Sequence, residues 1–135
     1  MHEAATPTIG PILVVEPDTD VRELVAEFLT KWGYAVNTAG TGSAAFDQVA
    51  IAWPAIVVTE LDLPDQNGLE LVLALRRILN RPAFAAVALS VFPLASYRRL
   101  HLDDAFALLV PKPFDSATLR SAIDACTRSL HASAQ

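Results

Sequence analysis

The sequence predicts a single α/β domain, in which a parallel β-sheet carries helices on both of its faces. The chain has 135 residues, so two domains would each have too small a core. Short apolar segments rich in β-branched residues alternate five times with longer amphipathic segments. Such an alternation, joined by short connections, is typical of a parallel sheet covered by helices on both sides.

The first two strands and helices follow from apolar runs and their spacing. A first strand is predicted at residues 12–15, because a continuous apolar run is typical of a strand buried on both faces. The next apolar residues recur at helical spacing up to Trp32, and Gly33 follows at a natural helix end. A second strand is predicted at residues 34–38, and Ser43 is expected to be the N-cap of a second helix.

The second half of the chain repeats the alternation. A third strand is predicted at residues 55–59, and a loop at residues 60–67 ends at Asn67-Gly68, where a third helix opens. The remaining elements are a fourth strand at 86–90, a shorter helix at 94–102, a fifth strand at 107–110, and a last helix capped by Asp115 or Ser116 and continuing through Leu130.

The charge balance argues against a nucleic-acid partner. Ten basic and fifteen acidic side chains give a formal net charge of -5. A phosphate backbone requires a clustered Lys/Arg surface, whereas the basic residues here form two isolated pairs, Arg76-Arg77 and Arg98-Arg99. Such pairs are more typical of the solvated face of a helix.

No secretory signal or membrane span is predicted. Residues 1–10 lack an apolar signal core and are expected to be a flexible tail. No stretch approaches the roughly 20 apolar residues that a spanning helix needs. The single cysteine, Cys126, excludes an internal disulfide and is predicted to be a small buried hydrophobe. We expect a cytoplasmic protein without a membrane partner.

Charged and hydroxyl-bearing residues follow four of the predicted strands. Glu16 and Asp18 follow the first strand, Glu60 the third, Ser90 the fourth and Lys112 the fifth. In doubly wound parallel sheets the functional crevice lies outside the carboxyl ends of the strands. We therefore expect these side chains to share one edge of the sheet.

Three stretches of the chain resemble response-regulator receiver domains of the chemotaxis-regulator type. Residues 12–20 look like the first strand and acidic pair of the family, and residues 110–114 look like its Lys-Pro-Phe signature. Residues 60–71 look like the phosphoacceptor loop, in which Pro64 lies four residues and Gly68 eight residues after the acceptor position.

The resemblance covers residues 11–130 and implies a (βα)5 flavodoxin-like fold with strand order 2-1-3-4-5. It implies a receiver domain at 11–131, with a C-terminal tail at 132–135. By resemblance the chain is expected to be a stand-alone, atypical response regulator of two-component, phosphorelay signalling, and not an enzyme. In this family a histidine kinase transfers a phosphoryl group to an aspartate, assisted by a divalent cation, a lysine and a hydroxyl.

The match to the family departs at the acceptor and at the metal ligands. The proline and glycine landmarks both place the acceptor at Glu60, whose extra methylene moves the oxygens by roughly 1 Å, a misplacement that can cost about 100-fold in rate. Asp62 falls where the family supplies a backbone carbonyl to the metal. Pro17 replaces the usual metal ligand, so Mg²⁺ binding is expected to be weak or absent, and no other cofactor is expected. Asp18 either joins Glu16 in an acidic pocket or, as we favour, caps the first helix.

Two further departures lie near the remaining pocket residues. Leu109 occupies the position of the aromatic switch residue, and Phe106 is nearby but out of register. Val91 follows Ser90 where a small residue normally leaves room for the phosphoryl group. Ser90 and Lys112 remain as predicted contacts of the phosphate pocket, although Ser90 would equally suit a strand end satisfied by the backbone.

Three hypotheses follow for function. The favoured one is a pseudo-receiver that acts by protein–protein interaction without phosphorylation, with the Glu60 carboxylate placing negative charge next to Lys112. The alternative is a conventional receiver in which Glu60 or Asp62 accepts phosphate. A flavodoxin-like enzyme or a nucleotide- or flavin-binding protein is disfavoured, because the loop after the first strand is acidic instead of rich in Gly, Ser and Thr.

The predicted partner surface comprises the fourth helix, the fifth strand and the fifth helix, which receivers use for dimers and partners. We expect a histidine kinase, another signalling protein or a second copy of the chain to bind there. The apolar residues in or near this surface are Leu94, Tyr97, Leu100, Leu108 and Leu109.

Overall fold

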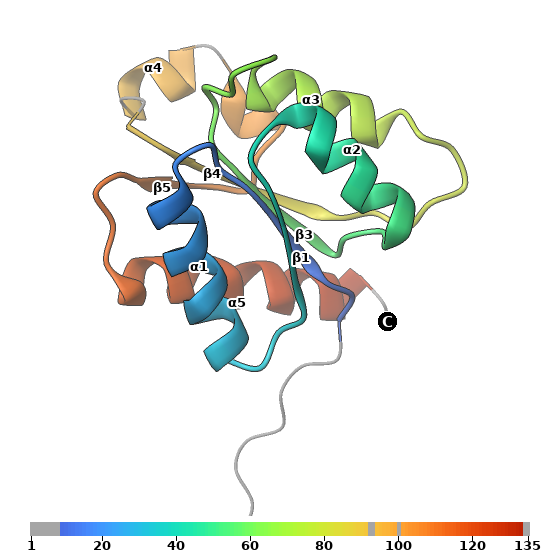
Figure 1. Cartoon of the computed structure of the whole chain (residues 1–135), viewed down its shortest axis with the longest axis horizontal. Coiled ribbons are helices and arrows are strands. Elements are labelled where there is room, and N and C mark those ends of the chain that lie inside the picture. The colour runs from blue at the N-terminus through green and yellow to red at the C-terminus, as the bar shows by residue number, and fades with distance from the viewer. Residues whose placement is uncertain (1–8, 92–93, 100, 134–135) are drawn as a thin grey trace, which may run out of the picture.

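The computed structural model describes residues 9–91, 94–99 and 101–133, in which strands and helices alternate along the chain (Figure 1). The elements in order are β1 (Ile12–Val15), α1 (Thr19–Lys31), β2 (Val36–Ala39), α2 (Gly42–Ile51), β3 (Ile56–Thr59), α3 (Gly68–Arg76), β4 (Ala85–Ser90), α4 (Leu94–Arg99), the 3-10 helix η1 (Leu102–Asp104), β5 (Leu108–Pro111) and α5 (Ser116–Ser133).

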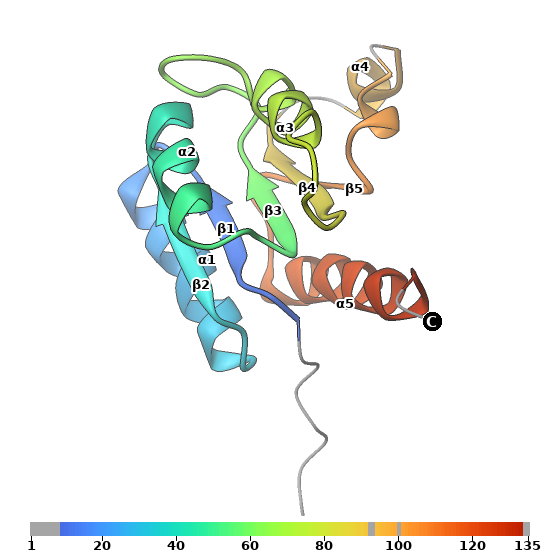
Figure 2. The ribbon, with the colours of Figure 1, turned by 90° about the vertical axis from the view of Figure 1, so that its right-hand side faces the viewer.

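The strands form one parallel sheet in the order β2-β1-β3-β4-β5, which confirms the predicted flavodoxin-like architecture. The side view shows the sheet between its helical layers (Figure 2). At the central strands, Val15 is paired with Ala39 on one side and with Thr59 on the other. The carboxyl ends of β1, β2 and β3 are therefore level with one another.

Two apolar cores cover the two faces of the sheet. Alternate residues of β1 point to opposite faces, as the period of a strand requires. Ile12 and Val14 pack with α1 and α5, whereas Leu13 and Val15 pack with α2, α3 and η1. All four β1 side chains are at most 2% exposed, which explains why this strand reads as an uninterrupted apolar run.

Short polar side chains begin the helices, as the cap rule requires. The Asn67 side chain accepts a hydrogen bond from the amide of Glu70 at the start of α3. The Asp115 carboxylate accepts one from Thr118 N at 2.7 Å, so Asp115, and not Ser116, supplies the cap of α5. Gly33, just after α1, has a φ of 97°, a left-handed conformation that favours glycine.

Two local predictions are wrong. Thr41, not Ser43, caps α2, because the Thr41 backbone is extended and its hydroxyl accepts from Ala44 N at 2.9 Å. Ser43 lies within the first turn of that helix. The predicted helix at 94–102 is divided, because His101 adopts a left-handed φ of 58° between α4 and η1.

One of the isolated basic residues is more than a solvated surface group. The guanidinium of Arg76 donates to the carbonyl oxygens of Phe84 at 3.1 Å and Ala105 at 2.9 Å. It also lies 4.4 Å from the centre of the Phe84 ring. Arg76 therefore ties the end of α3 to the beginning of β4 and to the segment before β5.

Other expectations concern the termini and Cys126. Within the described ranges, no helix is both long enough and apolar enough to cross a lipid bilayer. Cys126, on α5, is buried in the core, and this burial raises the pKa of its thiol to about 11. The tail predicted at residues 1–10 lies mostly outside the described residues, as do the last two residues of the chain.

Candidate functional site

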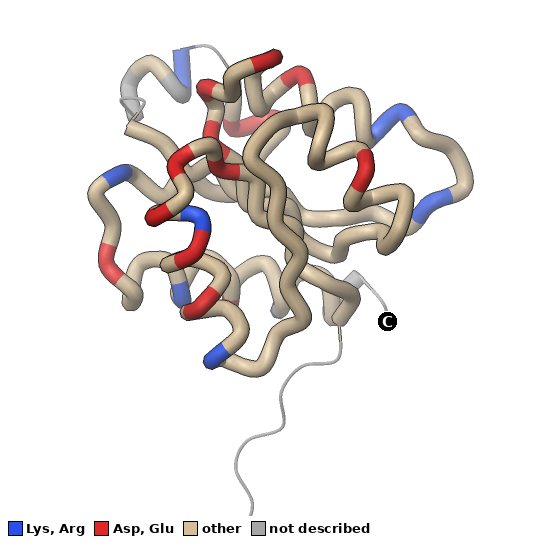
Figure 3. The backbone as a smooth tube through the Cα atoms, in the orientation of Figure 1, with Lys and Arg blue, Asp and Glu red and all other residues tan. Residues whose placement is uncertain are grey.

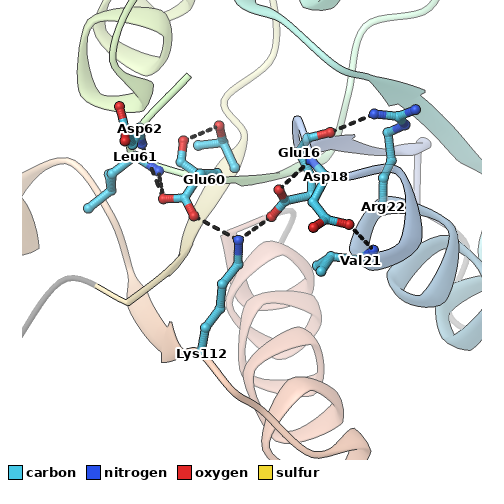
Figure 4. Close-up of polar contacts among 9 residues, drawn as sticks. Glu16, Asp18, Val21, Arg22, Glu60, Leu61, Asp62 and Lys112 are labelled. Carbon is cyan, nitrogen blue, oxygen red and sulfur yellow. Dashed lines mark hydrogen bonds and ion pairs between the residues drawn. The ribbon is translucent and has the colours of Figure 1, made fainter. Parts of the chain in front are cut away.

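Two carboxylates and one ammonium meet at the carboxyl edge of the sheet (Figure 4). Lys112 Nζ lies 2.7 Å from Glu60 Oε1 and also forms an ion pair with Glu16 Oε1. Both carboxylates are buried, with 1% of Glu16 and 7% of Glu60 exposed. We refer to Glu16, Glu60 and Lys112 as the ion triad.

Backbone hydrogen bonds of the sheet hold the triad in place. The amide of Glu16 donates to Ala39 O, that of Glu60 to Val15 O, and that of Lys112 to Ser90 O, each at 2.9 Å. Each triad residue therefore continues the hydrogen bonding of a strand by one residue beyond its end. The peptide bond between Lys112 and Pro113 is cis.

The Glu60 carboxylate is surrounded by hydrogen-bond donors. Its Oε2 accepts from Leu61 N at 2.6 Å and from Asp62 N at 3.1 Å, while its Oε1 accepts from Lys112. Burial alone would raise the pKa of Glu60. The hydrogen bonds from Lys112, Ser90 and Asp62 N outweigh burial and hold that pKa below its ordinary value of 4.5. Glu60 is consequently ionised at neutral pH.

Lys112 is held as an ammonium by its two partners. Partial burial would lower the pKa of Lys112, but its hydrogen bonds to Glu16 and Glu60 raise that pKa above its ordinary value of 10.5. Two carboxylates and one ammonium carry a combined charge of -1, so the triad leaves this edge of the sheet negative. The tube view shows acidic residues gathered around it (Figure 3).

Glu16 and Asp18 have different tasks after β1. Glu16 Oε2 accepts from Asp18 N at 2.9 Å, and its backbone oxygen accepts from Arg22 Nη1 at 2.8 Å. The Asp18 carboxylate accepts from Val21 N at 3.1 Å and caps α1, which is the favoured of our two interpretations. The exposed Asp18 side chain therefore acts as the N-cap of α1.

The loop after β3 is fastened to the neighbouring helix. The two Asp65 carboxylate oxygens accept from Gly42 N and Ser43 N, each at 2.9 Å, at the start of α2. These hydrogen bonds lower the pKa of Asp65. We call this contact the Asp65 clamp. This contact was not predicted, although aspartate favours helix N-termini and the residue type therefore offered a signal.

Gly68 explains the glycine landmark in physical terms. A Cβ atom at this position would lie 2.4 Å from the backbone oxygen of Glu60, a contact closer than packing allows. The amide of Gly68 also donates to Leu61 O at 2.8 Å. The first turn of α3 can therefore approach the acceptor position only when residue 68 has no side chain.

The donor groups do not fit a magnesium ion. Mg²⁺ prefers a near-octahedral shell of oxygen ligands. Glu16 and Glu60 both direct Oε1 at the Lys112 ammonium and Oε2 at backbone amides, and Pro17 supplies no side-chain oxygen. Across the described part of the chain, no three His, Cys, Asp or Glu side chains are grouped so as to hold a metal. The Lys112 ammonium lies between the two carboxylates and pairs with both.

A cavity of about 660 Å³ opens beside Glu60. Its lining includes Glu60 and Ser90 of the predicted phosphate pocket, but its size was not predicted, and Val91, which was expected to narrow this space, is 73% exposed at its border. The lining residues are Pro17, Glu60, Leu61, Asp62, Asn67, Leu69, Ser90, Val91 and Leu102.

The expected partner surface is described only in part. Leu108 and Leu109 on the edge strand β5 are half-buried and line a cavity of about 450 Å³ against α5. Phe106, which the sequence places out of register with the switch position, is 1% exposed and packs in the core. The side chains of Leu94 and Tyr97, and the whole of Leu100, lie outside the described residues.

Comparisons with known proteins agree on one family. The family model described as "Response regulator receiver domain" matches residues 12–124. The chain is 30% identical over 119 residues to the DNA-binding transcriptional regulator NtrC of Azospirillum brasilense, covering 87% of this chain and 24% of that protein. It is 28% identical to an uncharacterized 14.6 kDa protein of Leptolyngbya boryana, covering 80% of this chain and 82% of that protein.

A comparison of the fold with solved structures gives a similar result. The crystal structure of a CheY-like response regulator receiver domain protein from Methanospirillum hungatei superposes with a TM-score of 0.82. That similarity covers 93% of this chain and 99% of the other at 19% sequence identity, and it concerns the fold alone.

Proposed function

The chain belongs to the response regulator receiver family of two-component signalling, and we propose that within this family it acts without phosphorylation, through contacts with other proteins. The observation that supports this proposal most directly is the ion triad. Lys112 and the backbone amides after β3 already engage both oxygens of Glu60.

Phosphorylation would require the triad to come apart. An attacking carboxylate oxygen must face the phosphorus in line with the leaving group, and a cation must neutralise the phosphoryl oxygens. Here the carboxylate at position 60 is engaged from both sides, and the residues present do not fit Mg²⁺. The combined charge of -1 further disfavours the approach of an anionic phosphodonor.

The same contacts suggest how an unphosphorylated receiver would hold one state. Glu60 brings a negative charge to Lys112 at 2.7 Å and fixes the first residues of the β3–α3 loop through their amides. Lys112 directly follows β5, the edge strand that carries Leu108 and Leu109. In this proposal the triad keeps the surface formed by β5 and α5 in a single arrangement, which a kinase, another signalling protein or a second copy binds.

The DNA-binding role in the name of the NtrC relative is not part of the proposal. The match spans about a quarter of that protein, and the present chain carries a net charge of -5. A phosphate backbone would need a basic surface.

The test is incubation of the purified protein with acetyl phosphate and Mg²⁺, followed by intact-mass measurement. We expect no phosphoryl adduct on the native chain and at most weak labelling of Glu60→Asp, because position 17 still lacks a metal ligand. Phosphorylation of Glu60 or Asp62 in the native chain would refute the proposal and favour a conventional receiver. Full labelling of Glu60→Asp would show that Pro17 matters less than the acceptor.

A further inference from the structure

The cavity beside Glu60 has the dimensions of a small-molecule site. Its volume of about 660 Å³ lies within the range of roughly 300–1,000 Å³ that such sites occupy. It is lined from the loops after β1, β3 and β4, at the sheet edge where ligands of this architecture bind. The apolar lining residues are Pro17, Leu61, Leu69, Val91 and Leu102.

The charged groups of the cavity have one sign. Its described lining includes the acidic residues Glu60 and Asp62 and no Lys or Arg. Glu60 is paired with Lys112 and is buried, whereas Asp62 is exposed and gives only its backbone amide to Glu60. The Lys112 ammonium beside Glu60 is already paired with two carboxylates, so an anion in the cavity would face a net negative charge, whereas a cation could pair with the Asp62 carboxylate.

We infer that this cavity binds a small organic cation with a flat apolar body, of the aryl amidinium or aryl ammonium class. The apolar body lies against Leu61, Leu69 and Leu102, where it removes apolar surface from water. The cationic end pairs with Asp62 at the rim. This inference rests on the proposed function, since a phosphoryl group on Glu60 would need the same space, and it gives the unphosphorylated receiver a different chemical input.

Three probes of nearly equal shape separate charge from shape. Benzamidine is cationic, benzamide is neutral and benzoate is anionic, and each is titrated into ¹⁵N-labelled protein while amide resonances are followed. We expect benzamidine to shift the resonances of Leu61, Asp62 and Val91 with a Kd on the order of 1 mM, typical of so small a ligand. Benzamide should bind several-fold more weakly, and benzoate should cause no saturable shift.

Variants identify the location of the binding. Asp62→Asn removes the charge from an exposed side chain and should raise the benzamidine Kd about three- to fivefold, as for a solvent-accessible ion pair. Leu69→Trp, on the half-buried first turn of α3, fills the cavity and should abolish binding. Asp47→Asn, which changes another exposed acid, on α2, is the matched control and should leave the Kd unchanged.

Three results would each overturn the inference. They are binding of benzoate as tight as that of benzamidine, no response to benzamidine, and an unchanged benzamidine Kd in Asp62→Asn. The phosphodonor experiment is independent of these titrations. If benzamidine causes no resonance shifts and the chain also remains unphosphorylated, the inference of a cation site is refuted and the proposed function is retained. A phosphorylated Glu60 removes the proposed function whatever the probes do.

Discussion

The loops after β1 and β3 begin with the same pattern, Glu-Xaa-Asp, yet they use it differently. In both loops one oxygen of the glutamate accepts from Lys112 and the other accepts from the amide two residues later, at 2.9 Å for Glu16 and 3.1 Å for Glu60. Lys112 thus lies between two similar carboxylate turns. Because the two turns are alike, the single Lys112 ammonium pairs with a carboxylate after each of the two strands.

The middle and last residues of the pattern create the difference. Leu61 donates a further hydrogen bond to its glutamate at 2.6 Å, whereas Pro17 has no amide hydrogen to give. Asp18 caps the helix that begins at the next residue, whereas Asp62 is exposed at the cavity. Residues of the same type after two parallel strands thus take roles set by how soon a helix follows.

The largest effect is expected from removing the shared cation. Lys112→Ala leaves two buried carboxylates facing each other, and loss of one partner from a buried ion pair costs roughly 3 kcal/mol or more of unfolding free energy. Urea denaturation at neutral pH measures this loss. Lys31→Ala, at the exposed end of α1, is the control and should change stability by less than about 0.5 kcal/mol. Similar stability of both variants would contradict a structural role for the triad.

The two glutamates should differ in the next test. Glu60→Gln weakens bonds to Lys112 and to two backbone amides, so we expect a loss of about 2 kcal/mol. Glu16→Gln affects Lys112 and one amide and should cost about 1 kcal/mol. Chemical denaturation of both variants under the same conditions decides the order. A larger loss for Glu16→Gln would show that the second amide at Glu60 contributes little.

The pH dependence of stability should sharpen the contrast between Glu60 and its cation. The pKa of Glu60 is lowered on folding, so its contribution is fully present above its unfolded value and is lost as the pH falls below about 4.5 through the folded value. The pKa of Lys112 is raised, so its contribution is present below 10.5 and is lost as the pH rises beyond that value. Thermal unfolding across pH should show a plateau between these limits. Glu60→Gln should flatten the acid side, and an unaltered acid side would contradict the assignment.

The smallest effects concern the two aspartates. Asp18→Ala removes a helix cap and should cost about 1 kcal/mol. Asp62→Ala alters an exposed side chain and should stay within about 0.5 kcal/mol. Urea denaturation of the pair gives the difference directly. Equal costs would mean that the Asp62 side chain contributes to the fold as much as a cap does.

Much of this fold could be predicted because its signals are local. The apolar run of β1 and the glycine after α1 mark their elements within a few residues of sequence. The spacing of Pro64 and Gly68 also placed Glu60 after β3, and the approach of Gly68 to the Glu60 carbonyl shows why residue 68 is a glycine. Thr41 and Ser43 are both reasonable caps by residue type, and only the extended backbone at Thr41 decides between them.

The remaining features depend on contacts between distant residues. The expected pair of Glu60 and Lys112 is present, but the second ion pair, from Glu16, depends on side-chain conformations across 96 residues of sequence. The cavity is the space left between several loops, and no single segment encodes its volume. The position of a residue at a strand end predicts whether it lies at this edge of the sheet. Identifying the hydrogen-bond partner of each of its atoms requires the three-dimensional structure.

The Asp65 clamp has a consequence for changes of chain length. It fixes the middle of the 60–67 connection to the start of α2, while the Glu60 carboxylate fixes its beginning and the Asn67 cap fixes its end. A connection held by contacts at three points cannot accommodate an inserted residue without breaking one of them, whereas surface loops usually tolerate insertions. Homologous chains that lengthen this segment would have to give up one of its anchors.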